Sequence, residues 1–257
     1  MLATAKAAAS ETSTVRFVQL GCVALFFGTW AALTYSHFVN RLFLPEPSAV
    51  WSALVKLAVS QTFWDNVGVT VSTTAVAYII ASALGITVGF VVGRSPVLTK
   101  AYRPVLSGLF AIPITLFFPL FVVMFGIGPA SKVAFGSLYA FFPVALNTIA
   151  GFSGIDRLFL RAAESQGATS WQMLRHIYLP GAWPVVISGL RIGFFITFAS
   201  VLGGETLSST AGMGHMIAHE ADLLEGPTMY AYIVIVLAVT MLLNAGLAQV
   251  EKRAGRS

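Results

Sequence analysis

The chain has 257 residues, of which 57% are hydrophobic and only 10% are charged. A soluble domain carries roughly 25% charged residues, because its surface must face water. So few charges cannot cover a globule of this length, and the composition therefore indicates a membrane protein. The basic residues outnumber the acidic ones by 15 to 10, but they are spread between apolar runs rather than clustered. No nucleic-acid partner is expected from that distribution.

Six apolar runs are long enough to cross a bilayer as helices, which takes about 20 apolar residues each. They cover approximately residues 17–39, 67–93, 104–126, 131–153, 185–206 and 228–249. The first run is too long for the apolar core of a signal peptide, so we interpret it as an uncleaved span. It holds the single cysteine, Cys22, which excludes an intramolecular disulfide. The predicted fold is an all-α polytopic membrane protein with about six transmembrane helices.

The distribution of Lys and Arg predicts the orientation, because basic residues favour cytoplasmic loops. If the N-terminus is inside, twelve of the fifteen basic residues are cytoplasmic, and only Arg41, Lys56 and Lys132 are outside. Both termini are therefore expected in the cytoplasm. The predicted organisation is a disordered cytoplasmic N-terminus (1–15), a transmembrane domain (16–250) and a cytoplasmic tail (251–257).

The first outer loop contains a second kind of helical pattern. Val50, Leu54, Leu57 and Ala58 recur at helical spacing, and Lys56 falls on the other face. This pattern predicts an amphipathic helix that lies at the outer interface.

Small residues recur at every fourth position of the second span, at Ala81, Gly85, Gly89 and Gly93. On a helix they form one smooth stripe, which lets a neighbouring backbone approach closely. The alternative is chance placement in a glycine-rich chain.

Two prolines, Pro113 and Pro119, fall within the third span. Each removes a backbone donor, so the helix is expected to kink or break there. Broken backbone at membrane depth is tolerated where it lines a cavity, which makes this span a candidate for the transport pathway. A purely structural kink remains an equal alternative.

The sequence of the longest predicted cytoplasmic loop, residues 155–180, indicates two short helices joined at a glycine. Gly167 can end the first helix in a left-handed conformation. Thr169 can cap the second, with Gln172 completing a capping box, and Leu179-Pro180 is expected to end it. Apolar residues exposed on such helices suggest docking to another protein, although the helices could instead lie flat on the membrane.

The same loop resembles a known family. Permease subunits of bacterial ABC importers share the pattern E-A-A, three residues, G, nine residues, I-x-L-P in this loop. The matching positions here are Ala162, Ala163, Gly167, Ile177, Leu179 and Pro180. The chain looks most similar to the nitrate, sulfonate, taurine and bicarbonate permeases over roughly residues 40–250. Further similar stretches are Leu44-Pro45-Glu46-Pro47, Phe125-Gly126-Ile127-Gly128 and Gly204-Glu205-Thr206.

The resemblance implies a multi-pass protein of the bacterial cytoplasmic membrane that works as a homodimer. It further implies two ATPase subunits docked on the cytoplasmic loops and an external solute-binding protein. The chain has no G-x-x-x-x-G-K-[S/T] motif, so it is expected to bind no cofactor itself and to be no enzyme. ATP and Mg²⁺ would be bound by the partner ATPase.

One position departs from the family pattern. The glutamate that opens the motif is replaced by Arg161, and Glu164 lies three residues later as a possible substitute. We expect the loop to couple to an ATPase with altered electrostatics.

Candidate pathway residues are polar or aromatic groups inside the spans. Glu205 is the most interesting, since an ionisable group near membrane depth is a functional candidate, although local pairing would also account for it. The others are Thr115, Phe117, Asn147, Thr148, Thr197 and Ser200. Each could equally be a hydrogen bond within the helix packing. His215 and His219 lie four residues apart, but without further ligands no metal site is predicted.

The predicted function is uptake of a small anionic solute of the sulfonate, nitrate, bicarbonate or carboxylate class. A secondary transporter or channel is the alternative, but it would require ionisable residues deep in several spans or a repeat between halves. A permease for a thiamine-precursor-like substrate is a further alternative. The sequence alone does not identify the solute.

Overall fold

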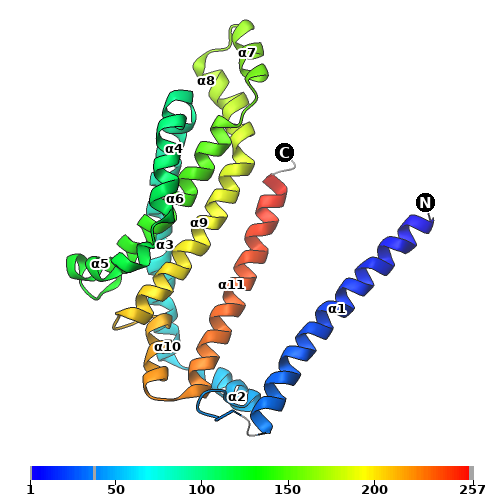
Figure 1. Ribbon diagram of the computed structural model, residues 1–257, viewed down its shortest axis with the longest axis vertical. Coiled ribbons are helices and arrows are strands. Elements are labelled where there is room, and N and C mark those ends of the chain that lie inside the picture. Colours follow the sequence, from blue (N-terminus) through cyan, green and yellow to red (C-terminus); the bar gives the residue numbers. More distant parts are fainter. Residues whose placement is uncertain (1, 37–38, 255–257) are drawn as a thin grey trace.

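The computed structural model describes residues 2–36 and 39–254, and among them every regular element is a helix (Figure 1). The predicted all-α fold is therefore confirmed over this part of the chain. In order, the elements are α1 (Leu2–Tyr35), α2 (Pro47–Ala58), α3 (Gln61–Gly93), α4 (Pro96–Ala111), η1 (Ile114–Phe117), α5 (Phe118–Phe125), α6 (Pro129–Ser153), α7 (Arg157–Ser165), α8 (Ser170–Met173), the π-helical η2 (Leu174–Tyr178), α9 (Leu179–Leu207), α10 (Met213–Asp222) and α11 (Gly226–Ala254).

Among the described residues, five stretches of helix are long and apolar enough to cross a membrane, and a bent pair counts as a sixth if it forms one span. The five are Phe17–Tyr35, Gln61–Gly93, Pro129–Ser153, Ser170–Leu207 and Gly226–Gln249. The bent pair joins α4 to η1 and α5 at an angle of 69°. This agrees with the expectation of about six spans, and the third predicted span is the broken one.

The break in the third span falls at the first of its two prolines. α4 ends at Ala111, and Pro113 precedes η1 with a non-helical ψ of 82°. Pro119 lies in the first turn of α5, where a missing N–H leaves no helical hydrogen bond unmade. The bend opens an apolar cavity of about 250 Å³ that Phe117 helps to line. The predicted interruption is confirmed, and its cause is Pro113.

The core is a layer of three helices in which α6 packs between α3 and α9. The small residues of α3 face α6: a Cβ added to Gly89 would lie 2.4 Å from Cβ of Thr148, and one on Gly85 would lie 2.8 Å from Cβ of Val144. The predicted stripe is therefore a helix-packing surface. α9 approaches α6 in the same way, through Gly189 and Gly193.

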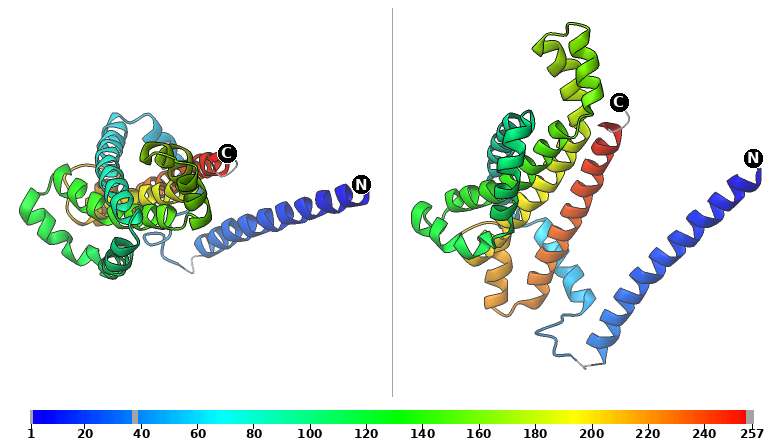
Figure 2. Two further views of the ribbon diagram at one scale, coloured as in Figure 1. Left: turned by 90° about the horizontal axis from the view of Figure 1, so that it is seen from above. Right: turned by 45° about the horizontal axis from the view of Figure 1, so that its top comes forward.

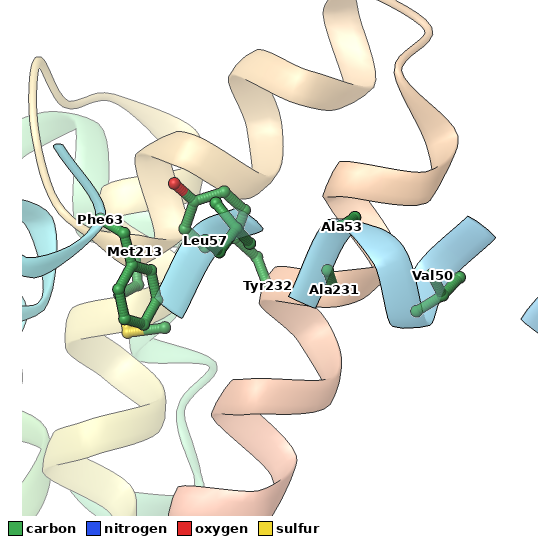
Figure 3. Packing of buried hydrophobic residues seen from close by; sticks show 7 residues of the cluster. All are labelled: Val50, Ala53, Leu57, Phe63, Met213, Ala231 and Tyr232. Carbon is green, nitrogen blue, oxygen red and sulfur yellow. The ribbon is translucent and has the colours of Figure 1, made fainter. Parts of the chain in front are cut away.

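The predicted amphipathic helix is α2. It lies at the end of the spans and packs against other helices of the protein. Val50, Ala53 and Leu57 are buried against Ala231 and Tyr232 of α11 (Figure 3). Phe63 and Met213 complete this cluster, so α2 also ties α3 and α10 to α11. Leu54 is half-buried, whereas Ala58 and Lys56 are exposed. The expected helix is confirmed, and its apolar face covers α11.

The first helix begins earlier than predicted. α1 runs from Leu2, so the expected disordered segment 1–15 is helical over its described residues. Alanine has the highest helix propensity, and five alanines fall within these fifteen residues. Figure 2 shows α1 standing away from the other helices. It is joined to the rest by Trp30, whose Nε1–H donates to the Pro45 carbonyl at 3.0 Å.

Different short helices lie at the two ends of the molecule. α7, α8, the start of α1 and the end of α11 lie toward one end, and α2 and α10 lie at the other (Figure 1). This arrangement is the one that six spans require, and it places loop 155–180 on the side of the termini. The assignment of that side to the cytoplasm stays a prediction, as does the tail 251–257, of which residues 255–257 lie outside the described residues.

Candidate functional site

The loop between α6 and α9 projects as two short helices, α7 and α8. Asp156 caps α7, its Oδ1 accepting the N–H of Leu158 at 2.9 Å. The helix ends at Ser165, and Gly167 follows with φ of +75°. The Ala168 N–H returns to the Ala163 carbonyl at 3.0 Å, which satisfies a carbonyl at the end of the helix. The predicted glycine elbow is confirmed.

Gly167→Ala is expected to loosen this elbow, because an L-residue in the left-handed region costs about 1–2 kcal/mol. No atom would clash with the new Cβ, so the effect is purely conformational. We expect faster proteolysis within the loop and a lower rate of coupled transport. Gly167→Asn is the matched control, since Asn tolerates this conformation better, and equal behaviour of the two variants would contradict the prediction.

The second helix carries the predicted capping box. The Thr169 side chain accepts from the Gln172 N–H at 3.3 Å, and Gln172 Oε1 accepts from the Thr169 N–H at 2.8 Å. These reciprocal bonds satisfy two amides of the first turn, as the sequence predicted.

The prediction that Leu179-Pro180 ends this helix is wrong. The chain passes from α8 through the π-helical turn η2 directly into α9. The Leu179 N–H bonds to the Leu174 carbonyl, five residues back, and this wider turn accommodates the ring and the missing donor of Pro180. α8, η2 and α9 together form one apolar stretch of 38 residues.

Apolar side chains are exposed on the projecting loop. Trp171 is 65% exposed, and Leu158 and Phe159 of α7 are 69% and 63% exposed. Met173 is buried and anchors α8. Of the positions predicted to contact an ATPase, Ala163 and Ile177 are half-buried, and the others are exposed: Arg161, Ala162, Glu164, Gly167, Leu179 and Pro180. An apolar surface of this kind at the tip of a protein fits a docking partner.

The loop is tied to the membrane helices by an arginine between aromatic rings. The Arg94 guanidinium, just past α3, lies 5.1 Å from the Phe90 ring centroid and 5.6 Å from that of Tyr178 in η2. Tyr178 in turn stacks on Phe152 at 6.3 Å. Contacts of this type contribute about 0.5–1 kcal/mol at exposed sites. η2 is therefore held against the ends of α3 and α6.

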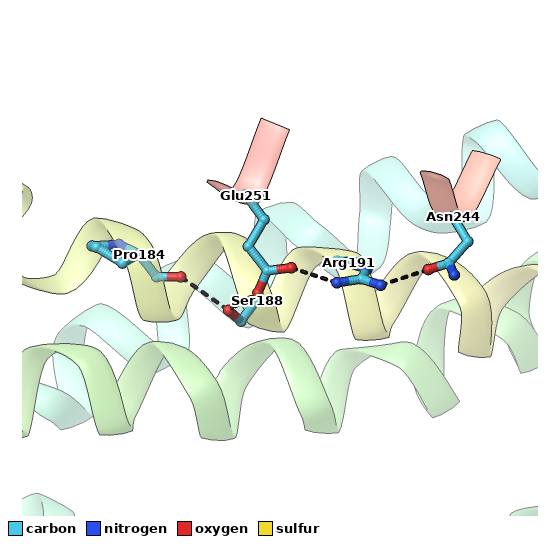
Figure 4. A network of polar contacts seen from close by, with 5 residues as sticks. All are labelled: Pro184, Ser188, Arg191, Asn244 and Glu251. Atoms are coloured by element: carbon cyan, nitrogen blue, oxygen red, sulfur yellow. Dashed lines mark hydrogen bonds and ion pairs between the residues drawn. The ribbon is translucent and has the colours of Figure 1, made fainter. Parts of the chain in front are cut away.

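A polar network joins α9 to α11 at the same end (Figure 4). Arg191 donates to Glu251 at 2.5 Å and to Asn244 Oδ1 at 2.6 Å. Glu251 also accepts from the Ser188 hydroxyl. The hydrogen bonds from Ser188 and then Arg191 lower the pKa of Glu251 below its usual 4.5.

This network predicts a small pH dependence of stability. A carboxylate with a lowered folded-state pKa stabilises the fold above its unfolded pKa of 4.5, and that contribution is lost as the pH falls through the lower folded value. Glu251→Gln should therefore be less stable than the parent above pH 4.5, by about 0.5–1 kcal/mol for a partly exposed pair. Thermal unfolding in detergent at a series of pH values measures the difference, which should shrink as the pH drops below 4.5. A difference that grows at low pH would contradict the assignment.

At the opposite end, Glu205 of α9 is buried and hydrogen-bonded. It is 2% exposed. Its Oε2 accepts the Gly214 N–H at 3.0 Å, and the Thr70 hydroxyl of α3 donates to the carboxylate with Oγ1 2.8 Å from Oε2. Lys132 of α6 is 1% exposed and lines the same small cavity. Its ammonium donates to the carbonyls of Ile127 and Gly128.

Side chains around Glu205 also cap the N-terminus of α10. The Gly212 N–H donates to Asn66 Oδ1 at 2.6 Å, and the Met213 N–H donates to Thr70 Oγ1 at 2.8 Å. Together with Glu205, these groups satisfy the first amides of α10, where negative charge is also favoured. Gly212 has φ of +109°, and a Cβ there would lie 2.3 Å from the Glu205 carboxyl carbon. Glu205 therefore holds the segment 208–214 in place.

Sequence reasoning singled out Glu205 but missed Asn66, Thr70 and Lys132 as its neighbours. Thr70 is 135 residues away in the chain, and no local pattern indicates such a pairing.

The other predicted pathway residues differ in burial and in their hydrogen bonds. Thr148 and Thr197 are fully buried and donate to carbonyls one turn back in their own helices, at 2.7 and 2.8 Å. Asn147 does the same to Pro143, and Ser200 is buried. Thr115 and Phe117 are exposed on the broken span. Their role in a pathway stays a prediction.

His215 and His219 stack on α10 with ring centroids 6.0 Å apart. Over the searched residues, no group of three or more potential metal ligands occurs.

Comparison with solved structures gives the fold. The fold matches a chain of the methionine ABC transporter MetNI in an inward-facing conformation, with a TM-score of 0.64 and 18% sequence identity. The match covers 76% of this chain and 99% of that one. The chain thus has the fold of an ABC importer permease.

Sequence comparison gives the family. Residues 81–256 match the binding-protein-dependent transport system inner membrane component family. The taurine transport system permease protein TauC of Escherichia coli (strain K12) is 30% identical over 92% of this chain and 88% of its own length. A putative aliphatic sulfonates transport permease protein, SsuC of Bacillus subtilis (strain 168), is 25% identical over 90% of this chain and 83% of its own. The chain belongs to this family of membrane permease subunits.

Proposed function

We propose that this chain carries a small anionic solute into the cytoplasm as a homodimeric pore, powered by two separate ATPase subunits. In this proposal α7 and α8 face the cytoplasm and dock the ATPases, which bind ATP and Mg²⁺. α2, α10 and the segment 208–214 face outward, toward an external solute-binding protein. The protein is placed in the cytoplasmic membrane of a bacterium, and the taurine and sulfonate relatives favour an organic sulfonate as solute.

The observation that carries the proposal is the projecting loop. Trp171, which is 65% exposed, lies on the second of two capped helices that project beyond the spans. Docking into a cleft of another protein would bury it, and tryptophan is enriched among the residues that dominate binding energy. The exposed guanidinium of Arg161, where relatives are expected to have an acid, favours an ATPase with a complementary acidic residue.

The coupling part is tested with Trp171→Ala in the purified complex. We expect the ATPase to bind at least tenfold more weakly, as is typical for a central interface tryptophan, and solute-stimulated ATP hydrolysis to fall accordingly. Trp51→Ala is the matched control, because Trp51 is 69% exposed at the opposite end. Undiminished ATPase binding by Trp171→Ala, or an equal loss with Trp51→Ala, would remove the support for docking on this loop.

The solute is tested separately, on the binding protein encoded with this chain. Mass spectrometry of its retained ligand should detect a small organic anion, with a sulfonate as the expected class. A neutral or cationic ligand would overturn the assignment of the solute and leave the coupling mechanism standing.

A further inference from the structure

A basic cavity lies where α3 and α6 end and α4 begins. Its volume is about 270 Å³. Three cationic side chains line it: Arg94 from the turn after α3, Lys100 from α4 and Arg157 from the start of α7. The remaining lining residues are Gly93, Pro96, Thr99, Phe152, Ser153, Ile155, Leu160 and Tyr178, so no carboxylate lines it.

Among the described residues, no ion pair neutralises these three charges. Among the described residues the ion pairs are Arg41 with Glu46 and Arg191 with Glu251, and neither includes a cation of the cavity. The Asp156 carboxylate, next to Arg157 in the chain, accepts the Leu158 N–H instead. Like charges gathered at one cavity repel one another, and an anion between them would relieve that repulsion.

One of the cations is held in place before any ligand arrives. Arg94 lies over the rings of Phe90 and Tyr178, which restricts its guanidinium to the cavity wall. A guanidinium presents several donors in a fixed plane and binds phosphate in a bidentate manner. A cavity with one restrained arginine, a second arginine and a lysine therefore suits a phosphate group.

The surroundings indicate which phosphate. The cavity lies at the ends of two membrane-spanning helices, which is the level of lipid headgroups. Beside it, α4 has no buried residue, and its Val97 and Tyr102 are 76% and 52% exposed. A lipid could thus place its headgroup in the cavity and its acyl chains along α4.

We propose that this cavity binds the phosphate headgroup of an anionic lipid from the inner leaflet. Basic pockets between helices on this side of a membrane are suited to such headgroups, because the charged groups meet at a fixed site. The inference rests on the orientation given under Proposed function, which places this end in the cytoplasm. Its test does not involve transport, so the two can fail independently.

The test is native mass spectrometry of the full-length permease in a neutral detergent, titrated with phosphatidylglycerol. Lys100→Gln and Arg157→Gln should each weaken the binding of the first lipid about fivefold. The matched control is Arg103→Gln, which removes a charge from the next turn of α4 but does not line the cavity. It should change the affinity by less than twofold. Equal losses in Lys100→Gln and Arg103→Gln would overturn the proposal.

Two further arms identify the ligand. Phosphatidylcholine should bind at least tenfold more weakly than phosphatidylglycerol, and glycerol 3-phosphate should compete only weakly because it has no acyl chains. Glycerol 3-phosphate competing as well as the lipid would overturn the lipid assignment in favour of a soluble phosphate. Unchanged lipid affinity in Lys100→Gln and Arg157→Gln, with a loss of ATPase binding instead, would also overturn it and identify the cavity as a protein contact.

Discussion

Gly89→Ala is expected to destabilise the protein by about 3 kcal/mol, at the upper end of the effects of overpacking. The added Cβ would lie 2.4 Å from Cβ of Thr148 and 2.8 Å from the carbonyl oxygen of Ala145. One of these atoms belongs to backbone and the other to a side chain that is completely buried, so no rotamer change relieves the contact. α3 and α6 must move apart, although their contact is the most extensive in the fold.

The matched control is Gly68→Ala in the same helix. A Cβ at Gly68 would meet nothing within 4 Å. Because alanine has the higher helix propensity, this substitution should stabilise α3 by up to about 1 kcal/mol. The two variants should therefore shift the thermal unfolding temperature in detergent in opposite directions. A Gly89→Ala variant that melts with the parent would contradict the close packing of α3 on α6.

Glu205→Ala is expected to lower the free energy of unfolding by about 3–5 kcal/mol. The substitution leaves the Gly214 N–H and the Thr70 hydroxyl without an acceptor, and it leaves the buried Lys132 ammonium without a nearby opposite charge. Glu205→Gln keeps one acceptor oxygen and should lose less. Glu225→Ala is the control, since Glu225 is an exposed acid at the same end of the molecule.

Hydrogen exchange distinguishes this prediction from general unfolding. In Glu205→Ala the amides of Gly212, Met213 and Gly214 should lose protection at temperatures at which α3 and α6 remain protected. The segment 208–214 would thus be released first. Protection of these amides equal to that of the parent would show that Glu205 does not hold the segment.

Local signals predicted the elements of this protein well. The spans follow from hydropathy, the break at Pro113 from the chemistry of proline, and the glycine elbow and capping box from residues within a few positions of each other. Each of these features depends on a short stretch of chain, so the local sequence is sufficient to predict it.

The predictions that were wrong or incomplete concern helices that extend further than expected and contacts between residues far apart in the sequence. The π-helical turn before Leu179 lets a helix continue through a Leu-Pro pair that normally ends one, and an alanine-rich segment taken as disordered forms part of α1. Glu205 was recognised as unusual, but its partner Thr70 comes from another helix. The packing of α2 on α11 also required knowledge of which helices are neighbours.

We propose that this chain is half of a pore that is driven by ATP through the loop of α7 and α8. The most direct measurement is uptake of the solute into liposomes that contain the permease and its ATPase, with ATP enclosed on the ATPase side and the binding protein on the other. We predict uptake that needs both ATP and the binding protein, and that falls at least tenfold in Trp171→Ala. Uptake that follows an imposed ion gradient and proceeds without ATP or the ATPase would contradict it.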